Sequence, residues 1–128
     1  MANNSRKKLL LVDDAEVHLE IAEFQLKKEY EITCARSGKE ALEHLTNGLV
    51  PNLIILDILM PDMDGWETFG RLKAISLLHA VPIIFLSSVT EKDEMDRAYN
   101  MGAAGFITKP YEEEELLGMV RKVLDEKL

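Results

Sequence analysis

The sequence predicts an α/β fold in which parallel strands form a central sheet and helices cover both of its faces. Short apolar runs alternate along the chain with segments whose apolar residues recur at helical spacing. The strand-like runs are apolar with a period of two or with no period, which predicts strands of a buried parallel sheet. This alternation is the pattern of a doubly wound (βα)5 three-layer sandwich.

The pattern predicts strands and helices in strict alternation. The strands are expected at residues 7–12, 31–35, 52–57, 82–87 and 105–108. The helices are expected at residues 15–28, 37–46, 65–74, 91–100 and 112–127. Because crossovers between parallel strands are right-handed, only a few strand orders remain for such a sheet.

Local signals agree with the predicted helix ends. Ser37 is followed three residues later by Glu40, which is the spacing of a capping box. Asn47 and Gly48 then favour the end of that helix. Residues 112–115 are all glutamate, and negative charge is favoured at the positive N-terminal end of a helix dipole.

Size and charge narrow the class of protein. The chain has 128 residues, so we expect a single domain over residues 1–128 with an ordered core at about 7–128. A formal charge of −8 opposes direct binding to nucleic acid or to an anionic membrane. The apolar runs are far shorter than the roughly 20 residues of a transmembrane helix, which favours a cytoplasmic protein. Cys34 is the one cysteine, and we expect it to be a small buried apolar residue.

Polar residues with useful chemistry follow the apolar runs at the point where each strand should end. Asp13 and Asp14 follow the first run, and Asp57 follows the third. Ser87 ends the fourth run, and Lys109 follows the fifth. The carboxyl ends of parallel strands share one edge of the sheet, where ligands of such folds bind. These five residues are therefore expected to lie together, although each taken alone could be a helix cap, a turn residue or a surface charge.

The expected cluster suits a divalent cation and a phosphoryl group. Three neighbouring carboxylates repel one another unless a cation neutralises them, and all-oxygen ligands favour Mg²⁺, or Mn²⁺ as a substitute. Asp57 ends a uniformly apolar strand, so its carboxylate is well placed to attack phosphorus and form an aspartyl phosphate. Lys109 would then stabilise charge on the phosphoryl oxygens, and Ser87 could donate a hydrogen bond to one of them. The histidines are read as plain surface residues: His18, His44 and His79.

Taken together, these residues resemble the receiver domain of two-component response regulators, from about residue 7 to residue 128. The matching elements are Asp13-Asp14 after Leu-Leu-Leu-Val, Asp57 with Met60-Pro61 and Asp64-Gly65 behind it, Ser87 after Ile-Ile-Phe-Leu, and Lys109-Pro110. The resemblance implies a flavodoxin-like sheet with the strand order 2-1-3-4-5. It also implies a cis peptide bond between Lys109 and Pro110.

The resemblance assigns a role to each site residue. Asp57 would accept a phosphoryl group from a histidine kinase or a histidine phosphotransfer protein. Asp13, Asp14 and Asp57 would hold Mg²⁺ together with the backbone carbonyl of Leu59. Ser87 would turn toward the phosphoryl group and Phe106 would move inward behind it, which would change the surface offered to a downstream protein or output domain.

Two other functions stay open on the sequence alone. The first is a Mg²⁺-dependent phosphatase with an aspartyl nucleophile, although such enzymes usually carry a second Asp at the position of Leu59. The second is a pseudo-receiver that binds partners without being phosphorylated, against which the complete set of acidic and Lys positions counts. A homodimer through the apolar arc of the last helix is also left open.

The first predicted helix is apolar on two sides. One stripe consists of Leu19, Ala22 and Leu26, and the other of Val17, Ile21 and Phe24. One stripe must cover the sheet. The other is expected to pack on the last helix or, alternatively, to dock a kinase helix bundle beside Asp57.

Overall fold

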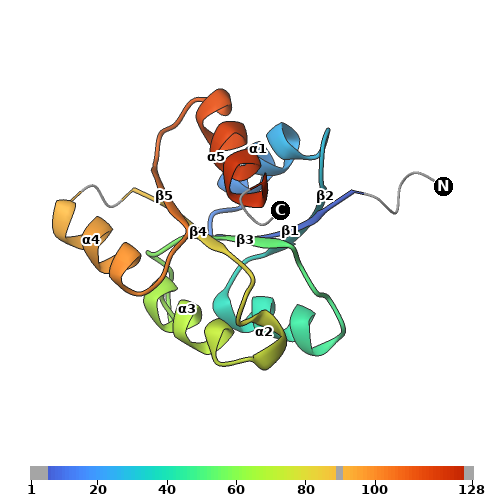
Figure 1. Ribbon diagram of the computed structural model, residues 1–128, viewed down its shortest axis with the longest axis vertical. Coiled ribbons are helices and arrows are strands. Elements are labelled where there is room, and N and C mark those ends of the chain that lie inside the picture. The colour runs from blue at the N-terminus through green and yellow to red at the C-terminus, as the bar shows by residue number, and fades with distance from the viewer. Residues whose placement is uncertain (1–5, 89–90, 126–128) are drawn as a thin grey trace.

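A computed structural model describes residues 6–88 and 91–125 and has the predicted alternation of strands and helices (Figure 1). The strands are β1 (Lys8–Val12), β2 (Glu31–Ala35), β3 (Leu53–Leu56), β4 (Ile83–Ser87) and β5 (Gly105–Thr108). The helices are α1 (Glu16–Leu26), α2 (Gly38–Thr46), α3 (Gly65–Lys73), α4 (Lys92–Asn100) and α5 (Glu113–Asp125). A short 3-10 helix, η2 (Ser76–Leu78), was not predicted from the sequence.

All five strands are parallel and lie in the order β2-β1-β3-β4-β5, which confirms the predicted order. The chain first moves from β1 outward to β2, and then crosses back to place β3 on the other side of β1. Strand order therefore reverses between β1 and β3. In an open α/β sheet, a crevice forms at such a reversal, outside the carboxyl ends of the strands.

Alternate residues of the central strands fill two separate cores. Leu10 and Ile54 face the layer formed by α2, α3 and α4, whereas Leu9 and Ile55 face the layer formed by α1 and α5 (Figure 1). Burying one such side chain stabilises the fold by about 1.5–3 kcal/mol. The sheet is rigid because both of its faces are covered, and its carboxyl edge is thus a firm support for polar side chains.

Side-chain caps define two of the helix starts. The hydroxyl of Ser37 accepts a hydrogen bond from the backbone N–H of Glu40, with an N···O distance of 3.0 Å, as the capping-box spacing predicts. Asp64 caps α3 in the same way, by accepting from the N–H of Glu67 at 2.9 Å. Most predicted bounds agree within two residues, and the predicted residues 126–127 of the last helix lie outside the described ranges.

The packing of α1 differs from the packing expected for its second stripe. Leu19, Ala22 and Leu26 are buried in the core that α1 shares with α5 and the sheet. A single stripe therefore covers the sheet and also meets the last helix. The expectation that the second stripe packs on α5 is wrong: Val17 and Phe24 are 63% and 60% exposed, and Ile21 is 46% exposed.

The loop between β3 and α3 is closed by a close approach of two backbone segments. The N–H of Gly65 donates a hydrogen bond to the carbonyl of Ile58 at 2.7 Å. A Cβ atom at position 65 would lie 2.3 Å from the backbone oxygen of Asp57, so the position requires glycine. The predicted cis peptide bond between Lys109 and Pro110 is present at the end of β5. Within the described ranges, no helix combines the length and the apolar character needed to cross a membrane.

Two glycines of α3 are predicted to respond to alanine in opposite directions. Gly70 is exposed within the helix and an added Cβ there meets nothing within 4 Å, so Gly70→Ala should raise the free energy of unfolding by about 0.5–1 kcal/mol. Gly65→Ala forces the two backbone segments apart and should lower the free energy of unfolding by about 1–3 kcal/mol. Urea unfolding of both variants measures the difference. Equal effects of the two changes would contradict this account of the loop.

Candidate functional site

The residues singled out at the strand ends meet at the carboxyl edge of the sheet. Asp13 directly follows β1, with its backbone N–H bonded to the carbonyl of Ala35 at 3.1 Å. Asp57 directly follows β3, and its N–H donates to the carbonyl of Val12 at 2.9 Å. One carboxylate oxygen from each of Asp13, Asp14 and Asp57 lies within 4.8 Å of the other two. The strand-end argument thus locates this cluster correctly.

Asp13 is buried and fully engaged by the surrounding chain. Its Oδ1 accepts a hydrogen bond from the N–H of Ala15 at 2.9 Å. Its Oδ2 accepts from the Nζ of Lys109 at 2.5 Å. Asp14 has an exposed side chain, so the cluster has one open side from which an ion or a phosphoryl donor can enter.

Asp57 is held in a fixed orientation at the centre of the edge. Its Oδ1 accepts a hydrogen bond from the N–H of Ile58 at 2.8 Å, and its Oδ2 lies 3.6 Å from the Nζ of Lys109. Burial, followed by repulsion from Asp13, raises the pKa of Asp57 from 3.8 to about 6, against the lowering effects of Lys109 and the Ile58 N–H. The carboxylate is therefore strained electrostatically in the absence of another cation.

The donor set fits a hard divalent cation. Three carboxylates carry three negative charges when ionised, and Lys109 contributes one positive charge to the same cluster. The remaining charge of about −2 is the charge that a divalent ion would balance, and the ligand atoms are all oxygen. The carbonyl of Leu59 is the further predicted ligand. The Leu59 side chain is 58% exposed, so it does not cover the entrance to the cluster with a packed apolar group.

Ser87 and Phe106 are both buried on the neighbouring strands β4 and β5. Ser87 is fully buried at the end of β4, and its carbonyl accepts a hydrogen bond from the N–H of Lys109 at 2.9 Å. Phe106 pairs with Phe85 in the sheet, and their ring centroids are 6.3 Å apart. Phe106 is only 6% exposed. The ring of Phe106 is therefore buried in this structure.

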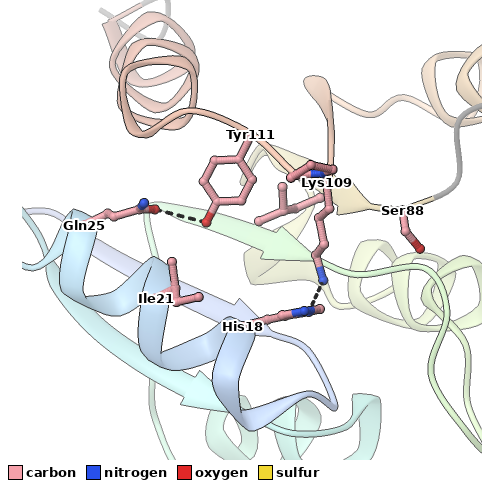
Figure 2. Close-up of a pocket in the computed structure, with 8 residues that line it drawn as sticks. His18, Ile21, Gln25, Ser88, Lys109 and Tyr111 are labelled. Carbon is pink, nitrogen blue, oxygen red and sulfur yellow. Dashed lines mark hydrogen bonds between the residues drawn. The ribbon is translucent and has the colours of Figure 1, made fainter.

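His18 is a site residue that the sequence reasoning missed. Its Nδ1 lies 2.8 Å from the Nζ of Lys109, and 3.6 Å from Oδ2 of Asp13 (Figure 2). The imidazole is half-exposed, which agrees with the expected surface position, and its contact with Lys109 was not expected from the sequence. The available signal was its spacing: it follows the acidic pair by four residues, one turn along a helix that begins at the same edge.

An open groove adjoins the cluster. It lies between α1 and the segment after β5, and a cavity of 440 Å³ occupies it. Its lining includes His18, Ile21, Lys109 and Tyr111 (Figure 2). Two of these, His18 and Lys109, also contact Asp13. The hydroxyl of Tyr111 donates a hydrogen bond to Oε1 of Gln25 at 3.0 Å, which joins the two walls. Ile21, which lines this groove, also belongs to the exposed stripe of α1.

The fold and the cluster are those of a known family. The family model described as the response regulator receiver domain matches residues 9–121. The chain therefore belongs to this family, which serves two-component signal transduction. Receiver domains bind Mg²⁺ at an acidic pocket, and the acidic cluster of Asp13, Asp14 and Asp57 is present here.

Individual relatives and solved structures agree with the family. The transcriptional regulatory protein CrdR of Helicobacter pylori is 32% identical over 121 residues, which are 94% of this chain and 56% of CrdR. The chemotaxis protein CheY4 of Vibrio cholerae has a structure with a TM-score of 0.87 and 29% identity, covering 93% of this chain and 99% of CheY4. The structure of a receiver domain of a histidine kinase from Syntrophus aciditrophicus has a TM-score of 0.84 and 32% identity. The match covers 94% of this chain and 91% of that one.

The chain spans about half the length of the curated relatives that it matches, 55% and 56% for two of them. The matched portion is the receiver domain.

The raised pKa of Asp57 predicts a pH-dependent effect of Asp57→Asn on stability. The folded protein binds the Asp57 proton more tightly than the unfolded chain, so the stability that protonated Asp57 contributes is fully present below about pH 4 and is lost as pH rises through about 6. Without divalent cations, Asp57→Asn should be more stable than wild type by about 2 kcal/mol at pH 7, with little difference near pH 4. Urea unfolding across this pH range measures it.

The matched control is Asp62→Asn, which removes an exposed carboxylate from the same loop. It should leave stability nearly unchanged at every pH. A stability difference between Asp57→Asn and wild type that does not vary between pH 4 and pH 7 would contradict the assignment.

Proposed function

We propose that this chain is a phosphorylation-controlled switch in which Asp57 accepts a phosphoryl group from a histidine kinase or a histidine phosphotransfer protein. The observation that carries the proposal is the meeting of Asp13, Asp14 and Asp57 within 4.8 Å, with Lys109 at 3.6 Å from Asp57. Asp57 is consumed in the reaction and restored by hydrolysis, so the chain is a phosphoacceptor and not a multiple-turnover enzyme. We further propose a cytoplasmic single domain over residues 1–128.

The transfer step uses the fixed geometry of Asp57. A carboxylate oxygen of Asp57 forms a bond to phosphorus, while the bond from phosphorus to the donor nitrogen of a phosphohistidine breaks and the nitrogen keeps the electron pair. The Ile58 N–H holds Oδ1 at 2.8 Å, which fixes the plane of the carboxylate. Lys109 would supply positive charge to the phosphoryl oxygens, and the Ser87 hydroxyl would donate a hydrogen bond to one of them.

Asp13, Asp14, Asp57 and the carbonyl of Leu59 would hold Mg²⁺, or Mn²⁺ in its place. A bound divalent ion would neutralise negative charge on the carboxylates and on the incoming phosphoryl group. The all-oxygen donor set and the excess negative charge of the cluster support this assignment.

Phosphorylation would then be read by a downstream protein or output domain. It adds roughly −1.5 to −2 charges and new acceptor oxygens beside Ser87 and Lys109, which can bias a two-state element. Phe106 links the edge to the interior through Phe85, whose ring also stacks on Phe69 at 5.4 Å. CrdR is described as a transcriptional regulatory protein, so in a longer protein nucleic acid would be bound by an output domain and not by this chain.

The exposed stripe of α1, formed by Val17, Ile21 and Phe24, would dock the phosphodonor. These side chains are 46–63% exposed and continue the groove that ends at Lys109. A partner helix on this stripe would bring its phosphohistidine to the open side of the carboxylate cluster. The alternative of packing on α5 is removed by the exposure of the stripe.

Incubation with acetyl phosphate and Mg²⁺ should add one phosphoryl group to the wild-type chain. Asp57→Asn should lose this labelling, because the substituted amide is not a nucleophile. Intact mass spectrometry and its dependence on added Mg²⁺ provide the measurement. Labelling that persists in Asp57→Asn, or that never occurs in the wild type, would refute the proposal. The latter result would favour a pseudo-receiver, and turnover of many equivalents of a phosphomonoester would favour a phosphatase.

Val17→Glu should slow phosphotransfer from a kinase or phosphotransfer protein that labels the wild type by about tenfold or more, because it buries an unpaired charge on docking. Labelling by acetyl phosphate should stay unchanged. The matched control is Leu77→Glu, at a side chain that is 76% exposed in η2, outside α1. Loss of both labelling reactions, or an equal effect of Leu77→Glu, would contradict docking on this stripe.

A further inference from the structure

We propose that His18 is a positioning residue that holds the ammonium of Lys109 in place for phosphoryl transfer to Asp57. The inference rests on the proposed function of Asp57, and it assigns a role to a residue that the acidic cluster alone does not require. His18 is supplied by α1, and Lys109 by the end of β5, 91 residues further along the chain.

The distances define a three-point arrangement around the ammonium. The Nζ of Lys109 lies 2.5 Å from Oδ2 of Asp13 and 2.8 Å from Nδ1 of His18. It lies 3.6 Å from Oδ2 of Asp57, beyond a direct hydrogen bond. Two short contacts therefore fix the position of the charge, and the reacting carboxylate faces it without being bound by it.

The contact also defines the chemistry of the imidazole. An ammonium has three donors and no acceptor, so Nδ1 of His18 must present a lone pair to it. The ring proton then lies on Nε2, which is the other tautomer position. Figure 2 shows this contact as a dashed line between the end of the Lys109 side chain and a ring nitrogen of His18.

The second acceptor, Nδ1 of His18, is important because the side chain of Lys109 is flexible. Lys109 reaches the cluster on a flexible four-carbon stem, and ordering such a stem has a large entropic cost. Asp13 is also one of the proposed metal ligands, so its oxygens would both accept a hydrogen bond from Lys109 and bind the metal ion. His18 is not one of the proposed metal ligands. It can keep Nζ beside Asp57 whatever else binds to Asp13.

The first test compares rates of labelling by acetyl phosphate with Mg²⁺. His18→Ala should lower the rate by roughly threefold to tenfold, because the ammonium loses one of its fixed acceptors. His18→Asn should restore most of the rate, since its side-chain oxygen can take the place of Nδ1. His18→Leu fills the space without an acceptor and should stay slow. His79→Ala, at an exposed histidine of the loop after η2, is the control and should match the wild type.

A second test needs neither metal nor phosphorylation. In the metal-free protein under mildly basic conditions, ¹⁵N NMR should show the Nδ1 signal of His18 shifted by hydrogen bonding, and Lys109→Met should remove that shift. The Nδ1 signal of His79 should not move. This readout separates the two proposals, because it reports the contact even in a chain that acetyl phosphate fails to label.

The outcomes are distinct. Two results together support the positioning role. The labelling rate falls in His18→Ala and His18→Leu and recovers in His18→Asn, and the ¹⁵N signal of His18 Nδ1 depends on Lys109. Equal rates for wild type and His18→Ala, or a slow His18→Asn, would overturn it. An Nδ1 signal of His18 that is unchanged in Lys109→Met would also overturn it. Urea unfolding midpoints within the spread of the control would show that a slow variant is not merely less stable.

Discussion

The structure depends on one electrostatic balance: the burial of Asp13 and Asp57 beside the single ammonium of Lys109. Burial and repulsion from Asp13 both oppose ionisation of Asp57 and raise its pKa, and Lys109 offsets only part of this penalty. The carboxyl edge therefore carries an unfavourable electrostatic interaction in an otherwise apolar, buried sheet. Functional sites commonly contain locally unfavourable interactions of this kind, and the rest of the fold offsets their cost in stability.

The compensation comes from the layers on either side. Both faces of the sheet are covered by apolar helix faces, so the strand ends cannot relax to separate the charges. The backbone contributes as well. The N–H groups of Ala15 and Ile58 are donated to Asp13 and Asp57, and the close approach at Gly65 keeps the loop after Asp57 compact. A site of this kind is held by the scaffold and would gain stability from any ligand that supplies positive charge.

Helix α1 connects the charged edge with the molecular surface. Its buried stripe contacts the sheet and α5, which leaves Val17 and Phe24 exposed. On the adjoining turn, His18 reaches Lys109, so the same helix that offers an apolar surface also contacts the charged site. A partner seated on α1 would thus lie beside the residues that the proposed chemistry uses. The groove lined by His18 and Tyr111 also contains Ile21 of the apolar stripe and Lys109 of the charged site.

The sequence by itself determined the fold class, the alternation of elements, the strand order through its resemblance to receiver domains, and the meeting of Asp13, Asp14 and Asp57 at one edge. Apart from the strand order, these features follow from hydrophobic periodicity and from the residues at the strand ends, which are local properties of the chain. Only the tertiary structure decided which stripe of α1 is buried and what His18 contacts. Both depend on how α1 is rotated about its axis and on residues about 90 positions away, namely α5 and Lys109. Apolar spacing on a helix with two apolar sides does not fix that rotation.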